Sequence, residues 1–233
     1  MIKDVLGQAM LDYQQAPPTK KKLWVLYPDG SKDEMMVGTY FRAFSKMPFL
    51  EQIALQECRG RVLDVGGGAG SHALWLQQKD LDVTALDTSA GAAEVARMRG
   101  VEQVVCEDIY AFQESGFDTL LLLMNGIGLS GSLAGLRTFL HHAQTLLAPG
   151  GQLLFDSSNV AYLYTNNPLL HDQYYGEVKC RYQYGHTKTD WFTWLYIDQQ
   201  QLTHVATALG WQVQLLFEDE DDQYLVRLTR AET

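Results

Sequence analysis

The chain has 233 residues, 46% of them hydrophobic and 20% charged, which is the composition of an ordinary globular protein with one α/β core and a small added subdomain. Its 18 Lys and Arg residues against 28 Asp and Glu residues give a formal net charge of −10, which opposes binding to a nucleic-acid backbone across any broad surface. The chain starts without a signal-peptide pattern, and no apolar run approaches the about 18 residues of a membrane span, so we expect a soluble, cytoplasmic protein with no membrane partner. The three cysteines are widely spaced and predict neither a disulfide framework nor a metal site.

Residues 1–50 precede the first buried strand and are predicted to form a helical leader or cap. We expect a helix, a loop at the polar break Gln14–Pro18, and a second amphipathic segment. The aromatic density of Tyr40–Phe44 is high for a leader, and Tyr40 and Arg42 stand out within it. The main domain is expected to cover residues 51–233.

A short apolar run that ends in a carboxylate and passes into glycines predicts a strand, a tight loop and a helix. Val62–Val65 contains β-forming residues typical of a strand buried on both faces, with Asp64 inside it, and helical character resumes at Ala73. Between them, Gly66, Gly68 and Gly70 permit positive φ angles and let a ligand approach the backbone. This stretch therefore predicts a ligand-binding loop.

The spacing of the glycines decides between ligands. A dinucleotide loop follows G-x-G-x-x-G, and from Gly66 the third glycine falls on Ser71. The pattern is instead D-x-G-x-G-x-G, starting at Asp64, and it resembles motif I of the class I S-adenosylmethionine-dependent methyltransferases. An acid at the loop entrance suits a ligand that carries an ammonium and a sulfonium, and suits a pyrophosphate poorly.

This resemblance also bears on the leader, which in many of these enzymes folds over the cofactor. It makes Tyr40 and Arg42 candidates for the methionine carboxylate, with packing of Tyr40 and solvent exposure of Arg42 as the alternative. After the loop, Ser71 is predicted to cap the next helix, and His72 is expected to be a surface or capping histidine rather than a ligand contact.

Two further predicted strands end in acids. Leu81–Asp87 ends in Asp87, which can accept hydrogen bonds from both hydroxyls of a ribose, and Thr88 begins the cap of the next helix. The short strand that starts at Gln103 is followed by Asp108 and Ile109. By the resemblance, Asp108 accepts a hydrogen bond from the adenine amino group and the Ile109 N–H faces the ring. Glu107 is the alternative to Asp108, because only register separates them.

The most continuous apolar run, Phe117–Met124, predicts a central strand and ends at Asn125, which the resemblance places beside the methionine moiety and the transferred methyl. The N-P-P-[YF] signature of methyltransferases that act on DNA bases or protein amides is missing from this position. A helix over 133–147, a turn at Ala148–Gly151 and a fifth strand over 152–156 are expected to follow.

Residues 157–194 are predicted to be an aromatic insertion that contains a β-hairpin, with strands at Val178–Tyr184 and Trp191–Ile197. The insertion could serve as a substrate lid; subunit contact or plain packing is the alternative. A helix capped by Asp198 and two strands, Trp211–Phe217 and Tyr224–Thr229, complete the chain.

The predicted fold class is α/β: a Rossmann-like methyltransferase fold with a seven-stranded, mostly parallel sheet, an antiparallel last strand, a helical leader and a β-hairpin insertion after the fifth strand. The expected function is methyl transfer from S-adenosyl-L-methionine to an unidentified small molecule. The alternatives are an NAD-dependent oxidoreductase, an aminopropyltransferase and a non-catalytic nucleoside-binding module. No catalytic base, acceptor atom or oligomeric state follows from the residues.

Overall fold

The computed structural model describes residues 4–164 and 174–230, and the chain divides into two compact units. The first unit comprises residues 1–48, 62–112 and 179–192, and the second comprises 49–61, 113–178 and 193–233. Part of the predicted insertion, residues 165–173, lies outside the described residues. In the described parts of the chain, no helix is long and apolar enough to cross a membrane.

The first unit contains the leader, the glycine loop and the strands on either side of it. Its elements are α1 (Val5–Gln15), β1 (Leu23–Leu26), β2 (Lys32–Met35), the 3-10 turns η1 (Val37–Phe41) and η2 (Phe44–Lys46), β3 (Arg61–Val65), α3 (Ser71–Gln77), β4 (Asp82–Asp87), α4 (Ala90–Met98), β5 (Gln103–Cys106), β8 (Glu177–Tyr184) and β9 (Thr187–Lys188).

The second unit contains the later strands of the main sheet and the helices beside them. Its elements are α2 (Phe49–Glu57), β6 (Phe117–Leu122), η3 (Gly126–Ser130), α5 (Leu133–Leu146), β7 (Leu147–Ser158), η4 (Ala161–Tyr164), β10 (Phe192–Leu195), α6 (Gln199–Thr207), β11 (Trp211–Glu218) and β12 (Gln223–Arg230). The side chain of Asp198 accepts a hydrogen bond from the Gln201 N–H, which confirms it as the cap of α6.

The main sheet has seven strands in the order β11-β12-β7-β6-β3-β4-β5. The pairs β4·β5 and β6·β7 are parallel, whereas β12 is antiparallel to both β7 and β11. The predicted mostly parallel sheet with an antiparallel last strand is therefore confirmed. Within it, β6 and β7 shift register between Phe117 and Thr119, and Gly150 inside β7 has φ +75. The predicted turn at Ala148–Gly151 is thus an irregularity inside β7.

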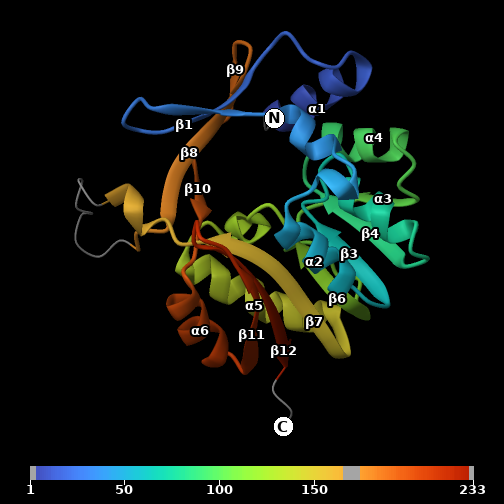
Figure 1. Ribbon diagram of the computed structural model, residues 1–233, viewed down its shortest axis with the longest axis vertical. Helices are drawn as coiled ribbons and strands as arrows, with labels where there is room; N and C mark the ends of the chain where they lie inside the picture. The colour runs from blue at the N-terminus through green and yellow to red at the C-terminus, as the bar shows by residue number, and fades with distance from the viewer. Residues whose placement is uncertain (1–3, 165–173, 231–233) are drawn as a thin grey trace. The chain divides into compact units, whose positions relative to one another are not determined.

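The leader is only partly helical, which corrects the prediction for its second segment. Residues 23–35 form β1 and β2, an antiparallel pair, and β1 also pairs antiparallel with β8 of the insertion (Figure 1). In the predicted hairpin, the strand at Trp191–Ile197 corresponds to β10, which is the neighbour of β8 in the second sheet, of order β10-β8-β1-β2. The predicted turn between them contains the short strand β9, which also pairs with β8. Leader and insertion, far apart in the sequence, therefore share one sheet.

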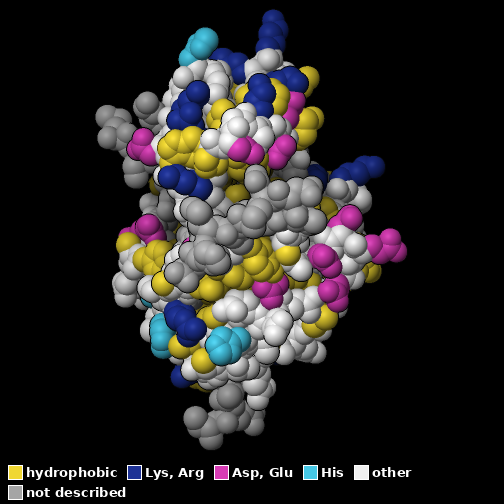
Figure 2. All heavy atoms as spheres, turned by 90° about the vertical axis from the view of Figure 1, so that its left-hand side faces the viewer, with side chains coloured by type: hydrophobic (Ala, Val, Ile, Leu, Met, Phe, Trp, Pro, Cys, Tyr) yellow, Lys and Arg dark blue, Asp and Glu magenta, His cyan; other side chains and the backbone are white. Residues whose placement is uncertain are grey.

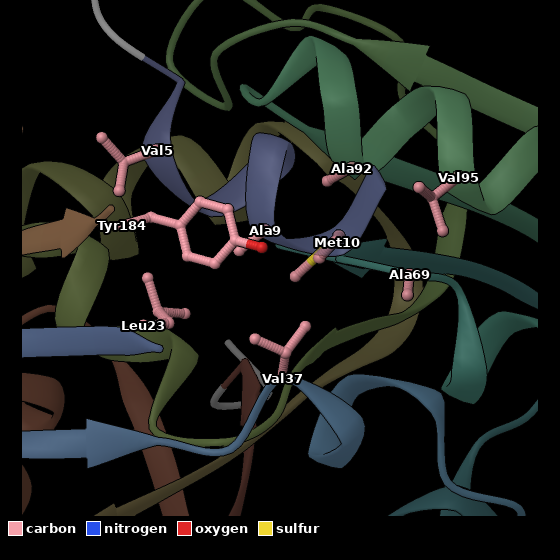
Figure 3. Packing of buried hydrophobic residues seen from close by; sticks show 9 residues of the cluster. All are labelled: Val5, Ala9, Met10, Leu23, Val37, Ala69, Ala92, Val95 and Tyr184. Carbon is pink, nitrogen blue, oxygen red and sulfur yellow. The ribbon is translucent and has the colours of Figure 1, made fainter. Parts of the chain in front are cut away.

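The leader helix α1 packs on α4 through two glycines. A Cβ on Gly91 would lie 2.7 Å from the carbonyl carbon of Gly7, so the close approach requires glycine at this crossing. Figure 3 shows the buried cluster beside it, where the Tyr184 ring and Leu23 from the small sheet face the leader helix. The same apolar cluster thus joins the leader, the insertion strand and the glycine loop.

Candidate functional site

The glycine loop is held by the next strand of the sheet. The Gly66 and Gly67 N–H groups donate to the Leu86 carbonyl oxygen, at 2.8 and 3.1 Å, where β4 ends. Gly66, Gly68 and Gly70 all have positive φ, at +75, +54 and +79, as the sequence predicts for a tight loop. The backbone turns sharply here, so the loop lies at the carboxyl ends of β3 and β4.

Gly70 is required for packing as well as for backbone conformation. A Cβ at this position would lie 2.5 Å from Val101 Cγ2 and 3.2 Å from Ala96 Cβ, so the loop can seat against the end of α4 only with glycine. Gly70 is also the residue that caps α3; the Ser71 hydroxyl does not cap it. Ser71 Oγ instead donates to the Tyr40 carbonyl oxygen at 2.6 Å, which corrects the predicted helix cap.

Asp64 places a carboxylate beneath the loop. The side chain is 1% exposed, and its Oδ2 atom has no hydrogen-bond partner among the described residues. Burial raises the pKa of the Asp64 carboxyl to about 6, and the charge of Asp87 adds to this, while the charge of His72 and the Ala73 N–H act to lower it. His72 is itself buried and interacts with Asp64, so the expectation of a surface or capping histidine is wrong. The site thus carries a buried acid whose charge favours a cationic ligand.

Asp87 is fixed at the end of β4 by two backbone groups. Its Oδ2 accepts from the Gly68 N–H at 2.9 Å and its Oδ1 from the Ser89 N–H at 2.8 Å. Burial raises the pKa of the Asp87 carboxyl and the charge of Asp4 adds to the shift, whereas these two N–H groups lower it. A carboxylate offers about four acceptor positions, so both oxygens keep capacity for the hydroxyls of a ligand.

The acids after β5 lie beside Asp87 in register. Asp87 pairs with Cys106, and the Glu107 N–H donates to the Asp87 carbonyl oxygen at 3.1 Å. Glu107 and Asp108 are both exposed, and Asp108 Oδ1 accepts from the Tyr110 N–H at 2.9 Å. Ile109 is buried at 5% exposure. The turn therefore presents one carboxylate in a fixed orientation and one apolar side chain packed beneath it.

Thr88 is exposed directly after Asp87, and its carbonyl oxygen lies 3.9 Å from Cys106 Sγ. Its backbone N–H lowers the pKa of Asp87 together with the other two N–H groups. Thr88 therefore contributes to the site through its main chain.

The leader brings Tyr40 to the loop. The Tyr40 ring lies close enough that a Cβ on Gly68 would be 3.4 Å from Tyr40 Cδ1. Arg42 directly follows η1 and is half-buried. The leader turn therefore brings the Tyr40 ring to the glycines.

Asn125 belongs to the second unit and has an unusual backbone. Its φ is +56 and its N–H donates to Asp156 Oδ2 at 2.9 Å. The side-chain amide donates to the Leu195 carbonyl oxygen at 3.2 Å, and its oxygen accepts from Ser157 Oγ at 2.9 Å. The Asn125 side chain is thus engaged by its own unit, and it holds the chain after β6 in a left-handed turn.

The aromatic insertion reaches this turn through its last residue. Trp194 Nε1 donates to the Asn125 carbonyl oxygen at 3.2 Å, and a Cβ on Gly128 would lie 2.0 Å from the same nitrogen. The indole therefore packs directly on the backbone of η3.

Two tyrosines of the insertion share one carboxylate. Tyr174 and Tyr175 each donate to Asp198 Oδ2 at 2.7 Å. Burial, and then the bond to Asp198, raise the pKa of Tyr175 to about 12, and burial raises the pKa of Tyr174 further. Neither hydroxyl is therefore ionised near neutral pH, and neither is suited to act as a general base there.

Sequence reasoning missed three residues: His72 as the partner of Asp64, Arg99 at the glycine loop, and Asp4 at the start of α4. No sequence pattern near Asp4 or Arg99 indicates their roles, because their hydrogen-bond partners lie far away in the chain. Within the residues described, no group of three or more His, Cys, Asp or Glu side chains could hold a metal ion.

Comparisons with known proteins agree with this geometry. A family model described as a methyltransferase domain matches residues 63–155. A SAM-dependent methyltransferase from Bacteroides fragilis, solved in complex with S-adenosyl-L-homocysteine, is 38% identical, with a TM-score of 0.91 over 99% of this chain and 96% of that chain. The CcbJ methyltransferase from Streptomyces caelestis shares the fold at 14% identity, with a TM-score of 0.64 over 82% of this chain and 99% of that one.

Among curated proteins, a ubiquinone biosynthesis O-methyltransferase from Alkalilimnicola ehrlichii is 29% identical over 109 residues. The match spans 42% of this chain and 42% of that relative's length. Together with the identity and coverage of the Bacteroides fragilis structure, these matches show that the chain belongs to the S-adenosylmethionine-dependent methyltransferases.

Proposed function

We propose that this enzyme transfers the methyl group of S-adenosylmethionine to a small-molecule acceptor, and that the first unit supplies most of the cofactor contacts. The orphaned Oδ2 atom of buried Asp64 supports the fit, because the cofactor carries two positive centres that an uncompensated carboxylate attracts. Asp87 is proposed to bind the ribose hydroxyls, and Asp108 with Ile109 the adenine. Further contacts come from the glycines and four other residues: Gly66, Gly68, Gly70, Tyr40, Arg42, Thr88 and Asn125.

Some of the residues proposed to bind the cofactor are supported by contacts in the structure, and others by the family resemblance. The loop, Asp87 and Tyr40 are supported by contacts with one another, since the Gly68 N–H donates to Asp87 and Tyr40 lies on Gly68. Arg42 and Asn125 rest on the family resemblance alone. Glu107 remains the alternative to Asp108, because both side chains are exposed at the same turn.

The cofactor supplies an electrophilic methyl group on a sulfonium when it is bound. The protein then acts mainly by orientation: Asp87 fixes the nucleoside, and the glycine loop with Tyr40 holds the methionine end of the cofactor. Holding the acceptor in line with the methyl group can lower the barrier by several kcal/mol. Tyr174 and Tyr175 are protonated at neutral pH and do not supply a general base there.

The observation that carries the small-molecule proposal is the packing of Trp194 on the turn at Asn125. An indole at this turn is a flat apolar surface of the kind that small organic acceptors contact. In Figure 2, most Lys and Arg side chains of the visible face lie in its upper half, where acidic and apolar side chains lie among them. Lys21 and Lys22, two of the leader's basic residues, are paired with Asp12 and Glu34.

The test is a screen of small-molecule acceptors for release of S-adenosylhomocysteine, with single-stranded DNA and RNA oligonucleotides in parallel. Turnover with a small molecule and none with an oligonucleotide is expected, and turnover with the oligonucleotides alone would refute the proposal. Decarboxylated S-adenosylmethionine with a polyamine acceptor, followed by release of 5′-methylthioadenosine, tests the aminopropyltransferase alternative. Titration with NAD tests the oxidoreductase.

The contribution of the insertion is tested with point variants, because replacing residues 160–192 would also remove β8, the partner of β1. Trp194→Phe should lower kcat/KM for the acceptor at least fivefold while S-adenosylhomocysteine affinity changes less than twofold. Trp191→Phe is the matched control, since Trp191 is 38% exposed and stacks with Arg181. Equal effects of the two substitutions would contradict the role of the insertion as a substrate wall.

A further inference from the structure

Arg99, the residue that caps α4 at its C-terminal end, joins three segments around the glycine loop. Its Nη1 atom donates to the Ala69 carbonyl oxygen at 2.5 Å and to Ser71 Oγ at 3.0 Å. The same nitrogen lies 3.5 Å from the Tyr40 carbonyl oxygen. A single guanidinium therefore contacts the loop, the start of α3 and the leader turn η1.

The leader side of this contact is reinforced by an aromatic ring and a second hydrogen bond. The Arg99 guanidinium carbon lies 5.0 Å from the centroid of the Phe41 ring, within the range of a cation–π interaction. Ser71 Oγ donates to the Tyr40 carbonyl oxygen at 2.6 Å. Burial lowers the pKa of Arg99 from its very high ordinary value, which leaves the side chain charged at neutral pH. The contacts combine charge, hydrogen bonding and stacking at one point.

These contacts of Arg99 with the leader turn hold the Tyr40 backbone, and with it the Tyr40 ring, at the glycine loop. Tyr40 belongs to the same 3-10 turn as Phe41, and its ring lies beside Gly68, where an added Cβ would be 3.4 Å from Tyr40 Cδ1. At the other end of α4, Asp4 accepts from Ser89 Oγ at 2.8 Å and from the Gly91 N–H at 2.8 Å. The leader is thus attached to α4 at both ends, and the Arg99 attachment is the one next to the loop.

We propose that Arg99 is a positioning residue that holds the leader turn η1 on the glycine loop, and that it sets the affinity for the amino-acid end of the cofactor through Tyr40. This inference rests on the cofactor orientation given above, with adenosine toward Asp87 and methionine toward the loop. It predicts that loss of Arg99 weakens binding of the amino-acid moiety and leaves binding of the nucleoside nearly unchanged.

The test compares two ligands by isothermal titration calorimetry on the full chain. S-adenosylhomocysteine contains the amino-acid moiety, and 5′-methylthioadenosine lacks it. Arg99→Met should weaken S-adenosylhomocysteine binding about tenfold and 5′-methylthioadenosine binding less than twofold. Arg99→Lys keeps the charge but not the planar fork, so it should give an intermediate loss. Arg97→Met, an exposed arginine two residues earlier in α4, is the matched control and should change neither affinity by more than twofold.

A double-mutant cycle separates positioning from a general structural role. In a Tyr40→Ala background, Arg99→Met should change S-adenosylhomocysteine affinity less than twofold, because Arg99 acts through Tyr40. Equal weakening of both ligands, full additivity with Tyr40→Ala, or an effect no larger than that of Arg97→Met would overturn the proposal. If Arg99→Met does not fold, the same comparisons with Arg99→Lys decide the question. The cofactor orientation itself is tested separately with Asp87→Ala. If adenosine does not lie at Asp87, this substitution will leave the affinity for 5′-methylthioadenosine unchanged.

Discussion

Asp64 is expected to lower the stability of the protein without cofactor and to increase its affinity for the cofactor. Its carboxyl has a pKa of about 6 in the folded protein, against 3.8 in its ordinary state. Because the folded form holds the proton more tightly than the unfolded chain, stability is lost as pH rises from about 4 through about 6. A shift of about two pKa units corresponds to about 3 kcal/mol in total, of which about 2 kcal/mol falls between pH 4.5 and pH 7.5.

The variant that removes this charge is Asp64→Asn. Urea unfolding of the cofactor-free protein at pH 4.5 and pH 7.5 gives the change in the free energy of unfolding for each protein. Between these two pH values, the wild type should lose about 2 kcal/mol more than the variant. Comparing the two changes cancels any constant penalty from burying the amide in place of the carboxyl. Glu94→Gln, at an exposed position of α4, is the control and should follow the wild type.

The same substitution should weaken binding of S-adenosylmethionine at least tenfold at pH 7.5, because the buried negative charge is lost. In the wild type, affinity should rise from pH 5 to pH 7 as Asp64 ionises. An identical pH dependence of unfolding in Asp64→Asn and wild type would refute the reasoning about burial. Unchanged cofactor affinity in the variant would refute the proposed role of the charge.

Three further outcomes are expected. Asp87→Ala should weaken S-adenosylhomocysteine at least tenfold in calorimetric titration, since hydrogen bonds to a charged group are worth about 1.5–3 kcal/mol each, and a loss below threefold would contradict the ribose assignment. Asp108→Ala should have a milder effect through adenine, and a larger effect of Glu107→Ala would transfer the assignment to Glu107. Gly70→Ala should lower the free energy of unfolding in urea by about 1–3 kcal/mol more than Gly210→Ala, because both have φ near +79 but only Gly70 would clash with a neighbour; equal losses would show that backbone strain alone acts.

Several features of this protein follow from short stretches of sequence. The strand, glycine loop and helix around Asp64 are encoded within about ten residues, because positive φ angles and loss of Cβ atoms are local properties of glycine. The cap of α6 at Asp198 and the acids at the ends of β4 and β5 also follow from short stretches, because helix capping and the end of an apolar run are local features. Seven strands in the expected chain order then follow from apolar runs bounded by turns.

Other features arise only when distant segments meet. Residues 23–26 are a four-residue apolar run, compatible with helix or strand, and pairing with β8 more than 150 residues later decides for strand. His72 begins a helix in the sequence, and only packing shows that it is buried beside Asp64. Asp4 meets Ser89 across 85 residues, and Arg99 meets Tyr40 across 59.

The sequence by itself determined the cofactor loop, the order of the strands and the acids at their ends, since these depend on local backbone preferences and on hydrophobic periodicity. The tertiary structure alone decided that the leader and the insertion share a sheet, that Asp64 is a buried acid with a raised pKa, and that Arg99 and Asp4 attach the leader to α4. The physical reason is that burial and long-range hydrogen bonds are properties of pairs of segments, and no single segment encodes its partner.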